Sequence, residues 1–66
     1  MRYFFHVRGV TISDPDLTGK IFSTQDGAKA FAMHMANELA KEGGFTGAWV
    51  LVTDEVGAEI IRVSIE

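Results

Sequence analysis

The spacing of apolar residues changes twice along this 66-residue chain, and this change limits the folds that the chain can adopt. Period-2 alternation near the N-terminus is typical of a strand, and a central segment has apolar residues at helical spacing. Extended segments return after the helix and form a hairpin. We therefore expect one α+β domain over residues 1–66, of ββαββ order, with a four-stranded, mainly antiparallel sheet and one helix on one face. The expected strands are residues 2–8, 20–22, 49–53 and 59–65.

The predicted helix has recognisable signals at both ends. Ser23 or Thr24 can cap its N-terminus, and Asp26, three residues after Ser23, is close to a capping-box arrangement. Gly43 and Gly44 end it, because glycine adopts the left-handed cap conformation at little cost. The stripe expected to face the sheet consists of Ala28, Phe31, Ala32, Met35 and Leu39. The residues expected to point away are Ala30, Met33, His34, Asn37, Ala40 and Lys41.

A domain of this size has a thin core, and such domains are often stabilised by a disulfide, a metal or a partner chain. The chain has no cysteine, which excludes disulfides and thiolate metal sites and leaves self-association. Its net charge of −3 gives no general attraction to nucleic acid or to anionic lipid. The N-terminal segment has the pattern of a strand and not of a signal peptide. We expect a cytoplasmic protein with no membrane partner.

The second face of the sheet carries more apolar side chains than an open face usually does. The third strand is apolar on both sides, so either Trp49 with Leu51 or Val50 with Val52 is left away from the helix. We interpret this surface as a homodimer interface, because such patches usually mark contacts and a two-fold dimer is the commonest symmetry. In the alternative interpretation, the loop Gly9–Gly19 folds over the patch. The predicted interface residues are Phe4, His6, Arg8, Trp49, Leu51, Ile60 and Arg62.

Few residues of the chain suggest catalysis or metal binding. His6 and His34 lie on different predicted elements, and no nucleophile motif accompanies either of them. The glycine-rich segment 43–47 follows a helix, whereas a phosphate-binding loop precedes one. The loop carboxylates do not have the spacing of a calcium loop, so we assign them to turns and solubility. They are Asp14, Asp16, Asp54 and Glu55. We predict no catalytic, cofactor-binding or metal-ligating residue, no cofactor, and a protein that is not an enzyme.

Two functions therefore remain for the second sheet face. The first is a small protein-interaction domain, as a homodimer or with another protein partner. The alternative is a nucleic-acid-binding or regulatory module that uses His6, Arg8 and Arg62, since aromatic and basic side chains on a sheet also bind RNA. The chain is acidic and lacks ribonucleoprotein motifs, so the first function is favoured.

Four segments carry a resemblance to a known family. They are Arg2-Tyr3-Phe4-Phe5-His6, Asp16-Leu17-Thr18-Gly19, the alanine-rich Ala28–Ala40, and Asp54-Glu55-Val56-Gly57. Together they resemble short bacterial proteins, common in alpha-proteobacteria such as the rhizobia, that are classed as a domain of unknown function. The family typically opens with R-Y-F-F and ends in a hairpin with a D-E-x-G turn. The resemblance implies the same fold and a bacterial cytoplasmic setting, and it brings no activity or catalytic residues.

Overall fold

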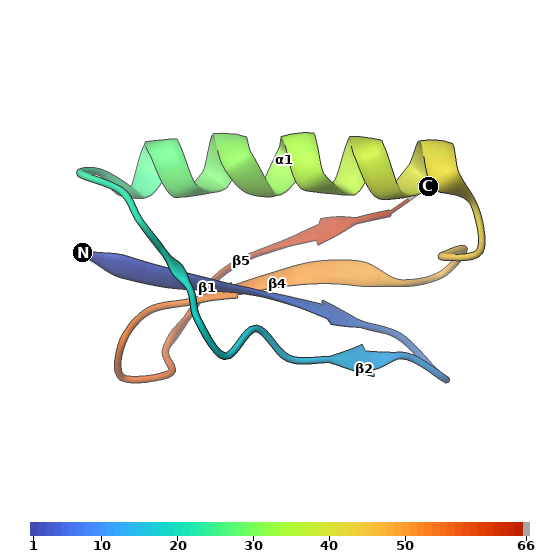
Figure 1. Ribbon diagram of the computed structural model, residues 1–66, viewed down its shortest axis with the longest axis horizontal. Coiled ribbons are helices and arrows are strands. Elements are labelled where there is room, and N and C mark those ends of the chain that lie inside the picture. Colours follow the sequence, from blue (N-terminus) through green and yellow to red (C-terminus); the bar gives the residue numbers. More distant parts are fainter. Residues whose placement is uncertain (66) are drawn as a thin grey trace.

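The computed structural model describes residues 1–65 and confirms the α+β class, with one helix against an antiparallel sheet (Figure 1). The sheet order is β2-β1-β4-β5, and β3 also pairs with β1. Both β2 and β3 are very short and pair with β1 at its opposite ends. The two-residue strand β2 was not predicted, because it lies inside the turn-rich loop. The elements are β1 (Arg2–Arg8), β2 (Ser13–Asp14), β3 (Lys20–Ile21), α1 (Gln25–Glu42), β4 (Trp49–Thr53) and β5 (Glu59–Ser64).

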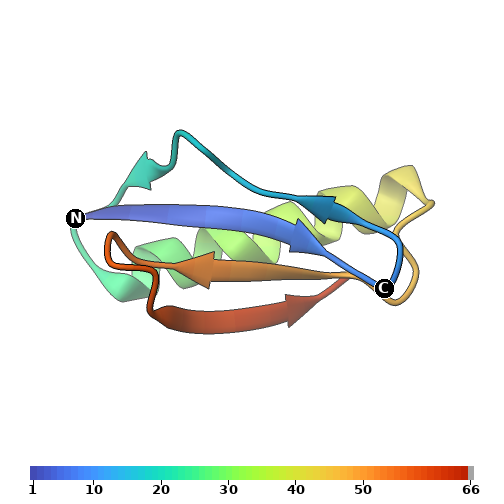
Figure 2. The ribbon, with the colours of Figure 1, turned by 90° about the horizontal axis from the view of Figure 1, so that it is seen from below.

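The core lies between α1 and one face of the sheet. Strand β1 alternates as its sequence predicts, and its buried residues are Tyr3, Phe5 and Val7. On β4 the fully buried pair is Val50 and Val52, which decides between the two pairs that the sequence left open. Trp49 and Leu51 therefore point away from the helix, together with the even-numbered residues of β1. Figure 2 shows the sheet from this side, with α1 behind it.

Helix α1 is capped by Thr24 at its N-terminus and by Gly43 at its C-terminus. The Thr24 side chain accepts a hydrogen bond from the Gly27 N–H at 3.1 Å, so Thr24 is the cap and the capping box from Ser23 is not formed. At the other end Gly43 has φ 81°, and its N–H donates to the Leu39 carbonyl at 3.2 Å. That backbone conformation favours glycine, and it confirms the predicted end of the helix.

The helix packs on the sheet through alanines. Ala28, Ala32 and Ala36 are buried, and their small side chains let the helix lie close to the strands. Ala40 also packs against the core, so its predicted outward position was wrong. The physical reason is the spacing of four residues from Ala28 to Ala40, which keeps all these side chains on one stripe. The stripe faces mainly β4 and β5. Within residues 1–65, α1 lacks the continuous apolar length of a membrane span.

The β4–β5 hairpin contains an irregularity near its turn. Val52 pairs with Ile61, but the next residue, Thr53, pairs with Glu59, so β5 has one extra residue there. That residue is Ile60, which is half-buried and packs against the core. In the turn itself Gly57 has φ 86°, a backbone conformation that favours glycine.

Candidate functional site

The sheet face that α1 does not cover, here called the outer face, is made by alternate side chains of three strands. Its half-buried or exposed residues are Arg2, Phe4, His6, Arg8, Trp49, Leu51, Thr53, Arg62 and Ser64. Six of the seven predicted interface residues are among them. The seventh, Ile60, is the extra residue at the hairpin irregularity. Alternation along β1 also places Arg2 here, although the sequence analysis did not select it.

Three residues at one end of the outer face form a connected group, which we call the Arg8–Trp49–Arg62 group. Arg8 and Trp49 are cross-strand partners on β1 and β4. The Arg62 guanidinium lies 5.5 Å from the centroid of the Trp49 ring, a cation–π contact. Its Nε and Nη2 atoms also donate to the two carboxylate oxygens of Glu59, at 3.2 and 3.3 Å.

Two hydrogen-bond donors of this group are buried without an acceptor. They are the Nε atom of Arg8 and the Nε1 atom of Trp49, and neither has a partner within residues 1–65. A buried donor without an acceptor costs about 1–3 kcal/mol. Both groups can only donate. An acceptor on another molecule can reach these two donors only when the Arg8 or Trp49 side chain turns outward, and that movement would remove the cost of burying them unpaired.

The outer face differs in charge from the rest of the chain. All three arginines, Arg2, Arg8 and Arg62, lie on it, whereas the three lysines lie on β3 and α1. Within residues 1–65, the acidic groups beside it are Glu59, the ion-pair partner of Arg62, and Asp16, whose backbone N–H bonds His6. The chain as a whole has a net charge of −3. The outer face is thus a basic surface on an acidic protein.

His6 connects the outer face to the loop that follows β1. Its Nδ1 atom accepts a hydrogen bond from the Asp16 backbone N–H at 3.0 Å, and its Nε2 lies 3.1 Å from Thr53 Oγ1. Because Nδ1 is an acceptor, the hydrogen-bond pattern assigns the neutral ring's proton to Nε2. In this tautomer Nε2 cannot accept a proton from the Thr53 hydroxyl. The pair is therefore not arranged as a nucleophile and its base. The other histidine, His34, is exposed on α1.

The Asp16 carboxylate replaces a missing strand partner. Strands β2 and β3 pair with the two ends of β1, and between them the Phe5 N–H donates to Asp16 Oδ2 at 3.1 Å. Asp16 Oδ1 accepts from the N–H groups of Thr18 and Gly19, both at 3.1 Å. Burial by itself raises the pKa of Asp16. The three backbone hydrogen bonds and nearby His6 outweigh burial, and the pKa is lower than its ordinary value.

The sequence reasoning treated Asp16 as an ordinary turn residue and missed this bridging role. The available signal was Asp16 followed at two and three residues by Thr18 and Gly19, the spacing at which an aspartate bonds its own loop. Gly19 has φ 75°, and a Cβ there would lie 2.9 Å from the Phe4 ring. The loop therefore borders the outer face at Phe4 and His6. This agrees in part with the alternative interpretation, in which the loop Gly9–Gly19 folds over this face.

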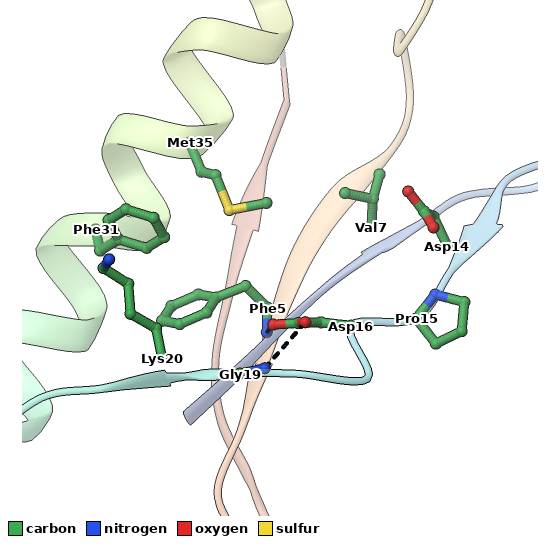
Figure 3. A pocket seen from close by; sticks show the side chains of 9 residues that line it. All are labelled: Phe5, Val7, Asp14, Pro15, Asp16, Gly19, Lys20, Phe31 and Met35. Carbon is green, nitrogen blue, oxygen red and sulfur yellow. Dashed lines mark hydrogen bonds between the residues drawn. The ribbon is translucent and has the colours of Figure 1, made fainter. Parts of the chain in front are cut away.

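A cavity of about 380 Å³ lies on the opposite side of the sheet, between α1 and the segment that contains Asp14–Lys20 (Figure 3). It exists because α1 lies mainly over β4 and β5 and leaves part of β1 less covered. The lining residues are Phe5, Val7, Asp14, Pro15, Asp16, Gly19, Lys20, Phe31 and Met35.

The loop carboxylates do not come together as a metal site. Asp14 and Asp16 line the cavity, whereas Asp54 and Glu55 lie in the β4–β5 turn, where Asp54 Oδ1 accepts from the N–H groups of Val56 and Ala58. No group of three or more potential ligands occurs within residues 1–65. Asp54 has the turn-forming role that the sequence analysis favoured, whereas Asp14 lies in β2 and Asp16 also bonds β1.

Three comparisons with known proteins give one match. A family model described as Domain of unknown function (DUF6894) matches residues 2–66. The searches of curated proteins and of solved structures found no match.

Proposed function

Since the chain belongs to the family described as a domain of unknown function, DUF6894, we propose its function from the geometry: it is a non-enzymatic domain that binds an acidic segment of a partner protein on its outer face. The observation that carries this proposal is the Arg8–Trp49–Arg62 group. Its two buried donors lack acceptors within residues 1–65, and the chain's three arginines lie on the same face. The proposal takes the protein to be cytoplasmic.

An acidic protein segment supplies what this surface lacks. Its carboxylates and backbone carbonyls are acceptors, and arginine binds carboxylates with two parallel hydrogen bonds. Arginine and tryptophan are also the residues that most often dominate binding energy at protein interfaces. Nucleic acid is a weaker candidate, because a protein with a net charge of −3 repels a dense polyanion at long range.

The homodimer predicted from the sequence is the second candidate. It is favoured by Leu51, a half-buried apolar residue that lies between His6 and Arg62 in the strand register. The positive charge of the outer face disfavours this homodimer. Two copies packed face to face bring two sets of three arginines together, and like charges across an interface are unfavourable.

The experiment uses Trp49, the only tryptophan of the chain, as a fluorescent reporter on the proposed site. The probe is a synthetic peptide of alternating glutamate and leucine, and its control has lysine in place of glutamate. We expect saturable binding of the acidic peptide alone. Arg8→Gln should weaken it about tenfold or more, because arginine is a frequent hot-spot residue. The control Lys41→Gln removes the same charge from an exposed position on α1 and should have little effect.

Three results would overturn the proposal. The first is equal binding of the lysine peptide, and the second is tighter binding of a single-stranded oligonucleotide. The third is a mass of twice 7.2 kDa by light scattering that Leu51→Glu returns to 7.2 kDa, which would establish the homodimer instead.

A further inference from the structure

The cavity between α1 and the Asp14–Lys20 segment has an apolar floor. Phe5 and Val7 contribute from β1, and Phe31 and Met35 contribute from α1. The rings of Phe5 and Phe31 meet edge to face, with centroids 4.9 Å apart and planes at 73°. These side chains provide a surface for a ring or a short alkyl group. A volume of about 380 Å³ is near the lower end for ligand sites, so the space suits a small molecule.

The polar groups around this floor are mainly acidic. Asp14 and Asp16 line the cavity from the loop side, and the two ion pairs found within residues 1–65 involve neither of them. Asp16 is held as a carboxylate by its three backbone donors, and its Oδ2 atom accepts one of these bonds, from Phe5. Asp14 is exposed at the rim.

Lys20, which also lines the cavity, lies over the Phe31 ring and is not ion-paired with Asp14 or Asp16. The Lys20 Nζ atom lies 5.5 Å from the centroid of the Phe31 ring, and Figure 3 shows the Lys20 side chain extending towards that ring. Neither carboxylate is paired with Lys20, and Asp16 Oδ2, which accepts only from Phe5 in the part of the chain that the structure describes, keeps room for a further donor. A metal ion is a poor candidate, because a third ligand is missing within residues 1–65.

From this arrangement we propose that the cavity is a binding site for a small primary amine that carries an apolar ring or chain. The apolar group lies against Phe5, Phe31 and Met35, and the ammonium group lies between Asp14 and Asp16. This site lies on the other side of the sheet from the outer face, so its test does not depend on the proposed protein-binding function. Asp16 nevertheless contacts both the outer face and the cavity, because its backbone N–H donates to His6 and its side chain lines the cavity.

The test is a titration of the ¹⁵N-labelled full chain with phenethylamine, followed by NMR. The amides of Phe5 and Gly19 report directly, because both donate to the Asp16 carboxylate. Two matched probes share the same ring: 2-phenylethanol is neutral, and phenylacetate is anionic. We expect saturable shifts with the amine, weaker binding of the alcohol, and the weakest binding of the anion.

Two variants separate the charge at the cavity from the net charge of the protein. Asp14→Asn removes the exposed carboxylate at the rim and should weaken amine binding by up to about fivefold, the range of a partly exposed ion pair. Glu55→Gln removes the same charge from the β4–β5 turn, where its side chain is exposed, and should leave the affinity unchanged. The proposal is wrong if millimolar amine gives no saturable shift at Phe5 and Gly19. It is also wrong if the alcohol or the anion binds as tightly as the amine.

Discussion

The carboxylate of Asp16 should contribute a large share of the stability of this small domain. In Asp16→Asn, the carbonyl oxygen can still accept from Thr18 and Gly19, but the amide group then points its own donors at the Phe5 N–H. Phe5 lies in the middle of β1, so its N–H loses an acceptor where water has limited access. The expected cost is about 1–3 kcal/mol for that donor. A domain of this length has a total stability of only about 3–10 kcal/mol.

The effect should depend on pH in a defined direction. The pKa of Asp16 is lower in the folded protein than its ordinary value of 3.8. The carboxylate therefore stabilises the fold fully above that ordinary value, and the contribution is lost as the pH falls through the lower, folded-state pKa. Asp16→Asn has no carboxylate at this position, so it has no such contribution to lose as the pH falls. The difference in stability between wild type and Asp16→Asn should accordingly shrink on acidification.

Urea denaturation, followed by circular dichroism at neutral and at strongly acidic pH, measures both effects. Asp14→Asn is the matched control, because Asp14 is exposed and takes part in neither of the ion pairs found within residues 1–65. The reasoning is refuted if Asp16→Asn is within about 0.5 kcal/mol of wild type at neutral pH, the range of ordinary surface substitutions. It is also refuted if the difference stays constant as the pH falls.

Five further substitutions test the packing, the backbone and the helix cap of the fold, each by urea denaturation. Ala32→Leu should destabilise the protein by about 1–3 kcal/mol, because the helix has no room there, whereas the exposed Ala30→Leu should have little effect. Gly19→Ala should cost more than the roughly 1–2 kcal/mol of the left-handed conformation alone, since the added Cβ lies 2.9 Å from a backbone oxygen. Gly43→Ala, with φ 81° and open space around it, should cost only that conformational energy. Thr24→Ala should cost about 1 kcal/mol through loss of the helix cap. Equal effects of the two glycine substitutions, or of the two alanine substitutions, would contradict the packing described above.

The elements could be predicted from the sequence because their signals are local. Alternation along β1, the helical spacing before Gly43 and the turn at Gly57 each depend on neighbouring residues, and all three are confirmed. The alanine stripe was only partly predicted, because alanine is weakly hydrophobic and Ala36 and Ala40 give little periodic contrast.

The features that could not be predicted depend on contacts between distant segments. The two sides of β4 are equally apolar in sequence, and only packing against α1 buries Val50 and Val52. The bond between Asp16 and Phe5 spans 11 residues and depends on the gap between β2 and β3. The two buried donors of Arg8 and Trp49 also arise only when β1 and β4 pair. The sequence therefore predicts the outer face and its residues Arg8, Trp49 and Arg62, but not that two of their donors are buried without an acceptor.

The central claim is that an acidic partner supplies acceptors to the Arg8–Trp49–Arg62 group. The most direct measurement is the ¹⁵N NMR signal of the Trp49 Nε1–H and of the Arg8 Nε–H during titration with the glutamate–leucine peptide. We predict that both side-chain signals shift and saturate together with the fluorescence change, since each donor gains an acceptor. Saturable binding that leaves both signals unmoved would contradict the claim, because the peptide would then bind elsewhere on the protein.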